Sequence, residues 1–97
     1  MSADVQETMV ESIKVARDRK LAIVLCDTHP AWIVSERVDL AKSTCVFDVV
    51  FRYGGQWAQR RYIYDAEVDV LHFNGETAFD ETQLHTLPDE MLFNLPT

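Results

Sequence analysis

The feature that most constrains the fold of this chain is the Gly-Gly pair at positions 54–55, which separates two stretches of alternating apolar and polar residues. A two-residue hairpin turn requires positive φ angles, and glycine adopts them without a Cβ clash. The pair therefore predicts two antiparallel strands with Tyr53 opposite Gln56. In that register Asp48 lies opposite Arg61, so opposite charges meet across the strands.

The predicted hairpin has an apolar and a polar face, because side chains alternate along a strand. We expect the apolar face to point toward the core, although Arg60 interrupts it near the turn. It carries Cys45, Phe47, Val49, Phe51, Ala58, Tyr62 and Tyr64. The other face, which carries Asp48, Arg52, Gln59 and Arg61, is expected to be largely in contact with water.

The N-terminal region predicts an amphipathic helix between Asp4 and Lys20. Its apolar residues recur at the spacing of one helical face and are Val5, Met9, Ile13 and Ala16. Asp4, with Glu7 at the third helical position, is a candidate N-terminal cap. Basic residues gather toward Lys20, where they would match the negative end of the helix dipole.

Two further strands are expected between this helix and the hairpin. The apolar run from Leu21 to Cys26 is typical of a strand that is covered on both faces. The Thr-His-Pro sequence at 28–30 then interrupts the chain, and a second strand is expected from Ala31. The stretch from 35 to 42 allows a continuing strand or a short helix, and the strand is favoured.

Beyond the hairpin, residues 68–73 predict another strand, and the Asn-Gly pair at 74–75 indicates a second hairpin turn that leads into residues 77–79. Asp80 followed by Gln83 resembles a capping box, which predicts a short helix that Pro88 ends. A second helical turn is expected over residues 89–93.

Together these elements predict one α+β domain over residues 1–97. We expect an N-terminal amphipathic helix packed on an antiparallel sheet of about four to five strands in hairpin or meander order, with short C-terminal helical turns. A chain of 97 residues that is 47% hydrophobic suits a single core. The N-terminal residues contain no apolar run of signal-peptide length and no membrane span, so a cytoplasmic location is expected.

Candidate metal sites in the sequence are weak. Four acids stand at positions 1, 3, 5 and 12 of a calcium-loop frame, but Val70 occupies the position that requires glycine; the acids are Asp65, Glu67, Asp69 and Glu76. Cys26 and His29 have the spacing of a zinc pair, yet no second close pair completes four ligands. We therefore expect no metal and no cofactor.

Catalytic residues are not evident either. A thiol nucleophile at Cys26 with His29 as its base remains one alternative, which would make the protein a small thiol/His enzyme or ligand binder. Cys26 and Cys45 are more typical of buried thiols than of a disulfide. The sequence therefore favours a protein that is not an enzyme.

The charge of the chain is divided between its two parts. The net charge is −7, every Lys and Arg lies at or before Arg61, and the remaining third carries eight carboxylates. We therefore expect a regulatory or interaction module that engages a basic protein surface through this acidic third. The candidate contact residues are Glu76, Asp80, Glu81, Asp89, Glu90 and Phe93.

Two other partner hypotheses follow from the same residues. The acids could stand in for phosphates, which would make the protein a DNA mimic that inhibits a nucleic-acid-binding protein. Direct nucleic-acid binding is not expected, because the basic residues are too few. The apolar inventory, including Trp32, Trp57 and Phe73, exceeds what one small core absorbs, so a homodimer is a further alternative.

Overall fold

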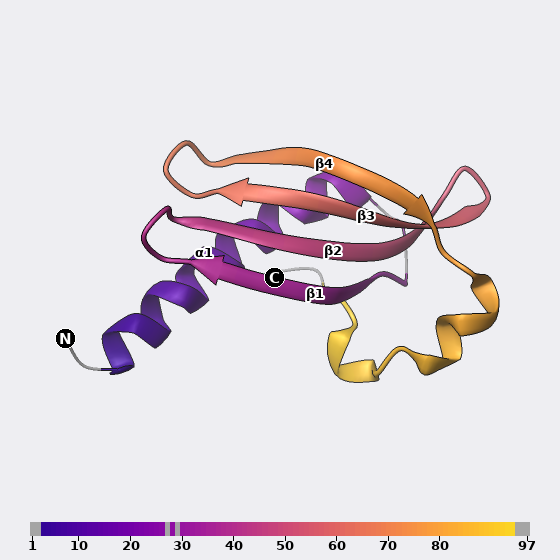
Figure 1. The fold of residues 1–97 in the computed structure, drawn as a ribbon, viewed down its shortest axis with the longest axis horizontal. Helices are drawn as coiled ribbons and strands as arrows, with labels where there is room; N and C mark the ends of the chain where they lie inside the picture. Colours follow the sequence, from indigo (N-terminus) through magenta and orange to yellow (C-terminus); the bar gives the residue numbers. More distant parts are fainter. Residues whose placement is uncertain (1–2, 27, 29, 95–97) are drawn as a thin grey trace.

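The computed structural model describes residues 3–26, 28 and 30–94. One helix and four strands make up the fold, with two short 3-10 helices after them (Figure 1). The bounds are α1 Ala3–Leu25, β1 Trp32–Asp39, β2 Thr44–Tyr53, β3 Gln56–Asp65, β4 Val70–Ala78, η1 Glu81–Thr86 and η2 Asp89–Met91. The strands form one antiparallel sheet in the order β1-β2-β3-β4. The predicted α+β meander with C-terminal helical turns is confirmed.

The β2–β3 hairpin has the predicted register. Tyr53 pairs with Gln56, and Asp48 pairs with Arg61 along the same ladder. The two glycines of the turn have φ angles of 62° and 83°, which explains why the turn needs glycine. The Gly-Gly pair thus determined the alignment of all ten residue pairs in this hairpin.

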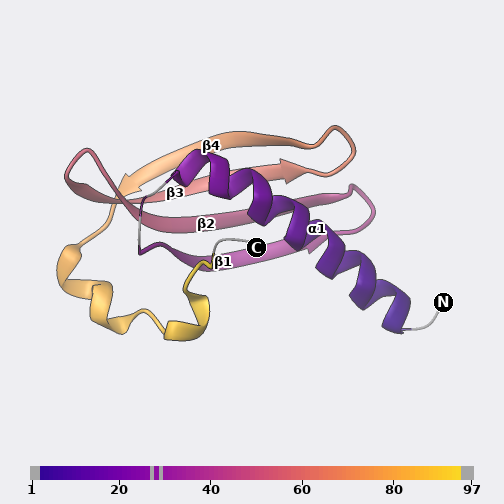
Figure 2. The ribbon, with the colours of Figure 1, turned by 180° about the vertical axis from the view of Figure 1, so that it is seen from behind.

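The helix α1 crosses one face of the sheet diagonally, and its last turns lie over β3 and β4 (Figure 2). Its core-facing residues follow one another at steps of four: Ile13, Arg17, Leu21 and Leu25. The predicted strand over Leu21 to Cys26 is therefore wrong, because this run continues α1. An unbroken apolar run suits the last turns of a buried helix as well as it suits a buried strand.

The predicted apolar face of α1 is also only partly correct. Ile13 and Ala16 pack against the core, but Val5 and Met9 are exposed. The helix extends beyond Lys20 to Leu25, so the basic residues lie in its middle and its last turn has none. The side chain of Asp4, the predicted cap, lies outside the described residues.

The Asn-Gly pair at 74–75 is a β-bulge and not a hairpin turn. β4 continues through it, while the pairing with β3 shifts between Arg60 and Tyr62. Gly75 has a φ of 119°, which other residues adopt only with strain. The sequence signal for positive φ was correct, but the chain uses it to bend a strand.

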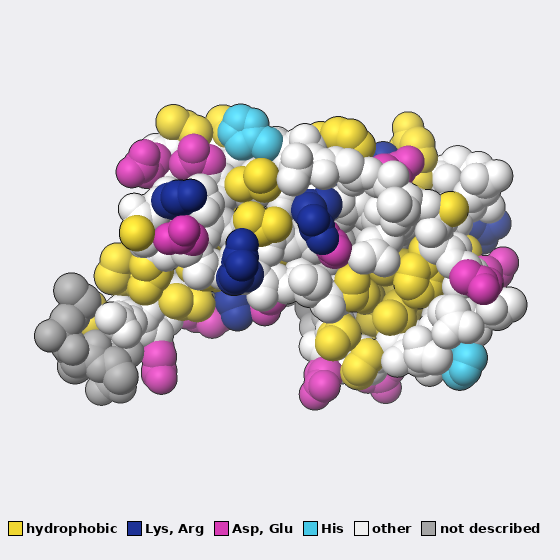
Figure 3. Space-filling model, in the orientation of Figure 1, with side chains coloured by type: hydrophobic (Ala, Val, Ile, Leu, Met, Phe, Trp, Pro, Cys, Tyr) yellow, Lys and Arg dark blue, Asp and Glu magenta, His cyan; other side chains and the backbone are white. Residues whose placement is uncertain are grey.

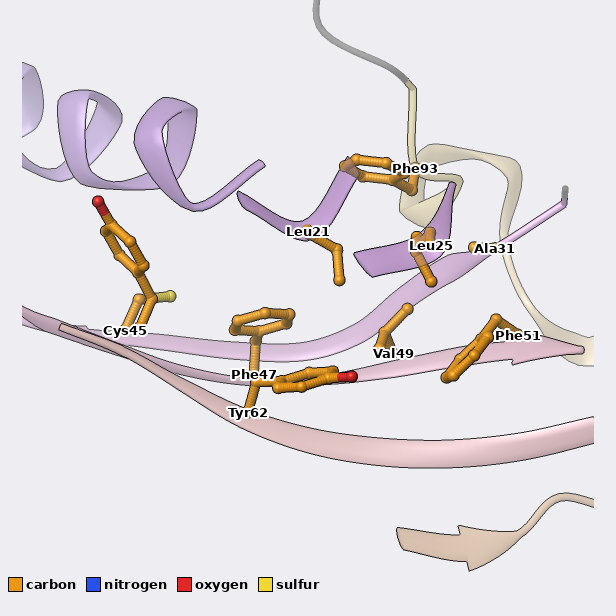
Figure 4. Packing of buried hydrophobic residues seen from close by; sticks show 10 residues of the cluster. Leu21, Leu25, Ala31, Cys45, Phe47, Val49, Phe51, Tyr62 and Phe93 are labelled. Atoms are coloured by element: carbon orange, nitrogen blue, oxygen red, sulfur yellow. The ribbon is translucent and has the colours of Figure 1, made fainter. Parts of the chain in front are cut away.

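The core lies between α1 and the sheet and is drawn in Figure 4. Apolar side chains of α1 meet the inner face of β2 and β3 there, and Phe93 closes one side. The cluster contains Leu21, Leu25, Ala31, Cys45, Phe47, Val49, Phe51, Tyr62, Tyr64 and Phe93. All seven hairpin residues that we expected to face inward are buried.

The outer face of the sheet, which α1 does not cover, is less exposed to solvent than predicted. Asp48 is 6% exposed and Val50 is fully buried, although both belong to this face. The ring of Trp32, which lies opposite Val50 on β1, has its centroid 5.9 Å from that of Trp57. Figure 3 shows apolar side chains gathered on this face toward the C-terminal segment, with Lys and Arg side chains nearer the opposite end.

The C-terminal segment, residues 79–94, runs from the end of β4 to the outer edge of β1 (Figure 1). Asp80 caps η1 by accepting hydrogen bonds from the backbone N–H and the hydroxyl of Thr82, at 3.0 and 2.8 Å. At its far end, the N–H of Phe93 donates to the carbonyl of Ala31 at 2.7 Å. At its near end, the N–H of Phe79 donates to the carbonyl of Trp57 on β3 at 3.0 Å, so both ends of the segment are fixed to the sheet.

Within the described residues, α1 is too polar to count as a membrane-crossing helix, and no other helix is long enough.

Candidate functional site

The C-terminal segment presents unpaired carboxylates on a folded frame. Asp80, Glu81, Asp89 and Glu90 are all exposed, and the segment contains no Lys or Arg. Among the described residues, Glu81, Asp89 and Glu90 form no ion pair. Hydrogen bonds from Thr82 lower the pKa of Asp80. Within the part of the chain that the structure describes, these four carboxylates therefore carry negative charge that no ion pair neutralises.

Two other candidates have structural roles. Glu76 accepts from the guanidinium of Arg60 at 2.6 Å across the β3–β4 ladder, so its charge is already compensated. Phe93 is 5% exposed and belongs to the core. A buried side chain offers no contact area to a partner, so Phe93 anchors the segment instead.

The eight carboxylates of the last third do not form one continuous band. Asp65, Glu67 and Asp69 lie at the β3–β4 turn, at the end of the sheet opposite the segment (Figure 1). Asp69 is paired there with Lys20, 3.1 Å from its ammonium, and accepts from the Tyr64 hydroxyl at 2.5 Å. Burial together with this hydrogen bond raises the pKa of Tyr64 to about 12.

A groove separates the C-terminal segment from α1 and β1, and it has a volume of about 390 Å³. Its walls carry one cation, Arg17, and three carboxylates: Asp18, Glu36 and Glu90. Backbone and apolar groups of 33–35 and 91–94 complete the lining. The excess of carboxylates means that the groove suits a positively charged group better than an anion.

Arg17 is the functional-site residue that the sequence did not reveal as special. It is 3% exposed, and its guanidinium lies 5.0 Å from the centroid of the Phe47 ring. It donates to Asp18 at 2.8 Å and to Glu36 at 2.6 Å, while Lys14 lies 2.9 Å from Glu36. Its spacing, four residues after Ile13 and four before Leu21, was the sequence signal that could have placed it on the core-facing side of α1.

The two carboxylates beside Arg17 have opposite pKa shifts. Burial would raise the pKa of Glu36, but hydrogen bonds from Arg17 and Lys14 outweigh burial and lower it. For Asp18, burial outweighs the attraction of Arg17, so the pKa is raised. Arg17 thus bonds to one carboxylate whose charged form is favoured by its hydrogen bonds and to another whose charged form is disfavoured by burial.

A second arginine, Arg60, lies among four aromatic rings. Its guanidinium carbon is 5.1 to 5.9 Å from the ring centroids of Phe51, Tyr53, Tyr62 and Phe73. It also donates to the Tyr62 hydroxyl at 2.9 Å. The hairpin register placed Arg60 on this face, and cation–π contact explains how the apolar surface accommodates it.

Asp48 holds the outer face of the sheet together. It accepts from Arg61 at 2.8 Å and from Gln59 at 3.0 Å. The hydrogen bond from Arg61 is the main reason that the pKa of Asp48 is lowered. The predicted charge pair is thus present, and its carboxylate is buried by its partners.

The cysteines do not form a disulfide. Cys26 is exposed, with its thiol donating to the carbonyl of Ile23 at 3.2 Å, and Cys45 is buried, where burial raises the pKa of its thiol. His29, the predicted partner of Cys26, lies outside the described residues. Within the described part of the chain, no group of three metal-ligating side chains is close enough to hold an ion.

Comparison with models of protein families, with curated proteins and with solved structures gives no match for this chain. The candidate site therefore depends on its own geometry alone.

Proposed function

We propose that this protein is a non-enzymatic interaction module that binds a basic protein surface through its C-terminal segment. The observation that supports this is the contrast in charge pairing. Five of the nine cations are compensated, because Lys14, Arg17, Lys20, Arg60 and Arg61 are each in an ion pair. The carboxylates of the segment have no such partners among the described residues.

The anchored geometry favours binding because the carboxylates are held in place before a partner arrives. A segment fixed at both ends loses less conformational freedom on binding than a free tail would. Its charges would steer a cationic surface toward it, and partly buried apolar side chains such as Leu84, Leu87 and Met91 would supply contact area at short range.

The groove beside the segment extends the same surface. Glu90 lines it together with Asp18 and Glu36, and among the described residues Glu90 is the one of these three carboxylates without an ion pair. A lysine or arginine side chain of the partner would find carboxylates on two walls there. This arrangement favours a partner protein over mimicry of a nucleic-acid backbone, because Asp65, Glu67 and Asp69 lie at the opposite end of the sheet and form no continuous row with these acids.

Charge neutralisation tests this function. The variant D80N/E81Q/D89N/E90Q removes four charges, and its Asp80→Asn change keeps a side-chain oxygen that can still cap η1. Its matched control, E7Q/E11Q/D39N/E67Q, removes four exposed charges elsewhere and changes the net charge equally. Each tagged protein is used for pull-down from the host cell at low and high salt, with quantitative mass spectrometry.

The expected result is a set of basic proteins that the wild type and the control retain and that the first variant loses by about tenfold or more, which corresponds to about 1.4 kcal/mol. Equal recovery by all three proteins would contradict the proposed function. Recovery of the basic proteins that does not decrease at high salt would also contradict it, because salt screens contacts between exposed charges.

A further inference from the structure

The two edges of the sheet differ in how they are protected. The edge strand β1 carries Glu36, Arg37 and Asp39, and its beginning is covered where Trp32 bridges to Leu92 of the C-terminal segment. Charged side chains and covering segments are the usual means of preventing an edge strand from pairing with another chain. β1 is therefore a protected edge.

The edge strand β4 lacks this protection over its regular part. Residues 70–75 include no Asp, Glu, Lys or Arg in a chain of net charge −7. Nearly every residue of β4 is exposed, including Val70 at 40% and Phe73 at 60%. The bulge at 74–75 disturbs only the second half of the strand. Within the described sheet, its first half thus offers edge backbone groups beside exposed apolar side chains.

The charges at both ends of this uncharged run are compensated within the protein. Asp69, just before β4, is paired with Lys20, and Glu76, just after the bulge, is paired with Arg60. If two β4 strands lie antiparallel, the Asp69–Lys20 end of one copy comes beside the Glu76–Arg60 end of the other. Each end offers a carboxylate and a cation, so the two edges are complementary in charge.

We propose that the β4 edge is the interface of a homodimer, in which two copies join through antiparallel β4 strands into one eight-stranded sheet. The sequence left self-association open, and the uncharged run of residues 70–75 brings no like charges together along this edge. The two-fold axis would be perpendicular to the sheet, so both α1 helices lie on the same side of it. The last turns of α1 lie over β3 and β4 (Figure 2), so this part of each helix would be near the seam.

Sedimentation velocity of the full chain tests this proposal across roughly 1 to 100 μM. The variant is Val70→Lys, which places a charged, strongly hydrated side chain in the uncharged run of each edge, the usual means of blocking edge-to-edge pairing. The matched control is Val5→Lys, the same substitution at a residue of similar exposure, 45% against 40%, on the first turns of α1. Circular dichroism confirms that each variant is folded.

The wild type and V5K are expected to be dimers at the upper concentrations, and V70K is expected to weaken association by at least about tenfold. A wild type that stays monomeric over the whole range would overturn the proposal, as would a V70K variant that associates like the wild type. If V70K is unfolded, amide exchange of the wild type decides: the β4 amides should gain protection as concentration rises, and constant protection would exclude this interface.

The dimer and the proposed function are tested separately. The pull-down variants leave β4 unchanged, and V70K leaves the C-terminal segment unchanged. A monomeric protein that still loses its partners in the D80N/E81Q/D89N/E90Q variant would contradict the dimer alone.

Discussion

At the scale of single residues, Arg17 shows how a charge is accommodated inside a small core. It takes the place of an apolar residue in the stripe from Ile13 to Leu25, and its guanidinium lies over Phe47 while bonding to Asp18 and Glu36. Both carboxylates keep about a third of their surface in water, at 29% and 34%. The network is therefore less costly to form than a fully buried ion pair.

Removal of Arg17 should destabilise the protein. Arg17→Ala loses the packing on Phe47 and leaves Asp18 without its ion pair, so we expect a loss of about 2 to 4 kcal/mol in the free energy of unfolding. Arg17→Met keeps much of the packing and should lose about 1 to 2 kcal/mol. Lys14→Met, which removes a more exposed cation from the same Glu36, should cost less than about 1 kcal/mol. Urea unfolding measures all three, and an Arg17→Ala variant as stable as the wild type would exclude this role.

At the scale of secondary-structure elements, prediction from the sequence was correct where a sequence pattern is compatible with only one structure. The Gly-Gly turn, together with the alternation of apolar and polar residues on both sides of it, predicted the β2–β3 hairpin and its inward-facing residues. The Asn-Gly pair requires positive φ in a turn and in a bulge alike, so local sequence could not distinguish them. The run from Leu21 to Cys26 is apolar on all sides, so periodicity could not distinguish a strand from the end of α1.

The candidate site was predicted in part, for a similar reason. The acids of the C-terminal segment are visible in the sequence because charge there is uncompensated along the chain. Their pairing in space is not visible, and this is why Glu76 proved to be neutralised by Arg60. The groove beside Arg17 forms where α1, β1 and η2 come together in the fold. No local sequence pattern predicts this contact between distant elements.

The bulge in β4 gives a test at this scale. Gly75 has a φ of 119°, and nothing lies within 4 Å of where a Cβ would be placed. Gly75→Ala should therefore destabilise the protein through backbone strain alone, by about 1 to 3 kcal/mol. Asn74→Ala, at the neighbouring position, should change stability by less than about 1 kcal/mol. Thermal unfolding compares the two, and equal stability of both variants would argue against a strained bulge.

At the scale of the whole molecule, the carboxylates of the acidic third differ in whether they are paired with a cation. Near the sheet, Asp69 and Glu76 are neutralised by Lys20 and Arg60, and β4 becomes an edge of low charge. Beyond the sheet, the C-terminal segment keeps its carboxylates unpaired among the described residues. The molecule thus separates a surface suited to a second copy from a surface suited to a basic partner.

The proposed role of the C-terminal segment requires that this acidic segment is held on the folded sheet. Phe93 anchors the end of the segment, because its side chain is buried in the core and its N–H donates to the carbonyl of Ala31 at 2.7 Å. Amide hydrogen exchange at Phe93, measured by NMR, reports whether the segment stays attached to the sheet. We predict that this amide exchanges about as slowly as those of the β2–β3 ladder. Exchange of Phe93 at the rate of an unstructured peptide, while that ladder stays protected, would contradict the claim.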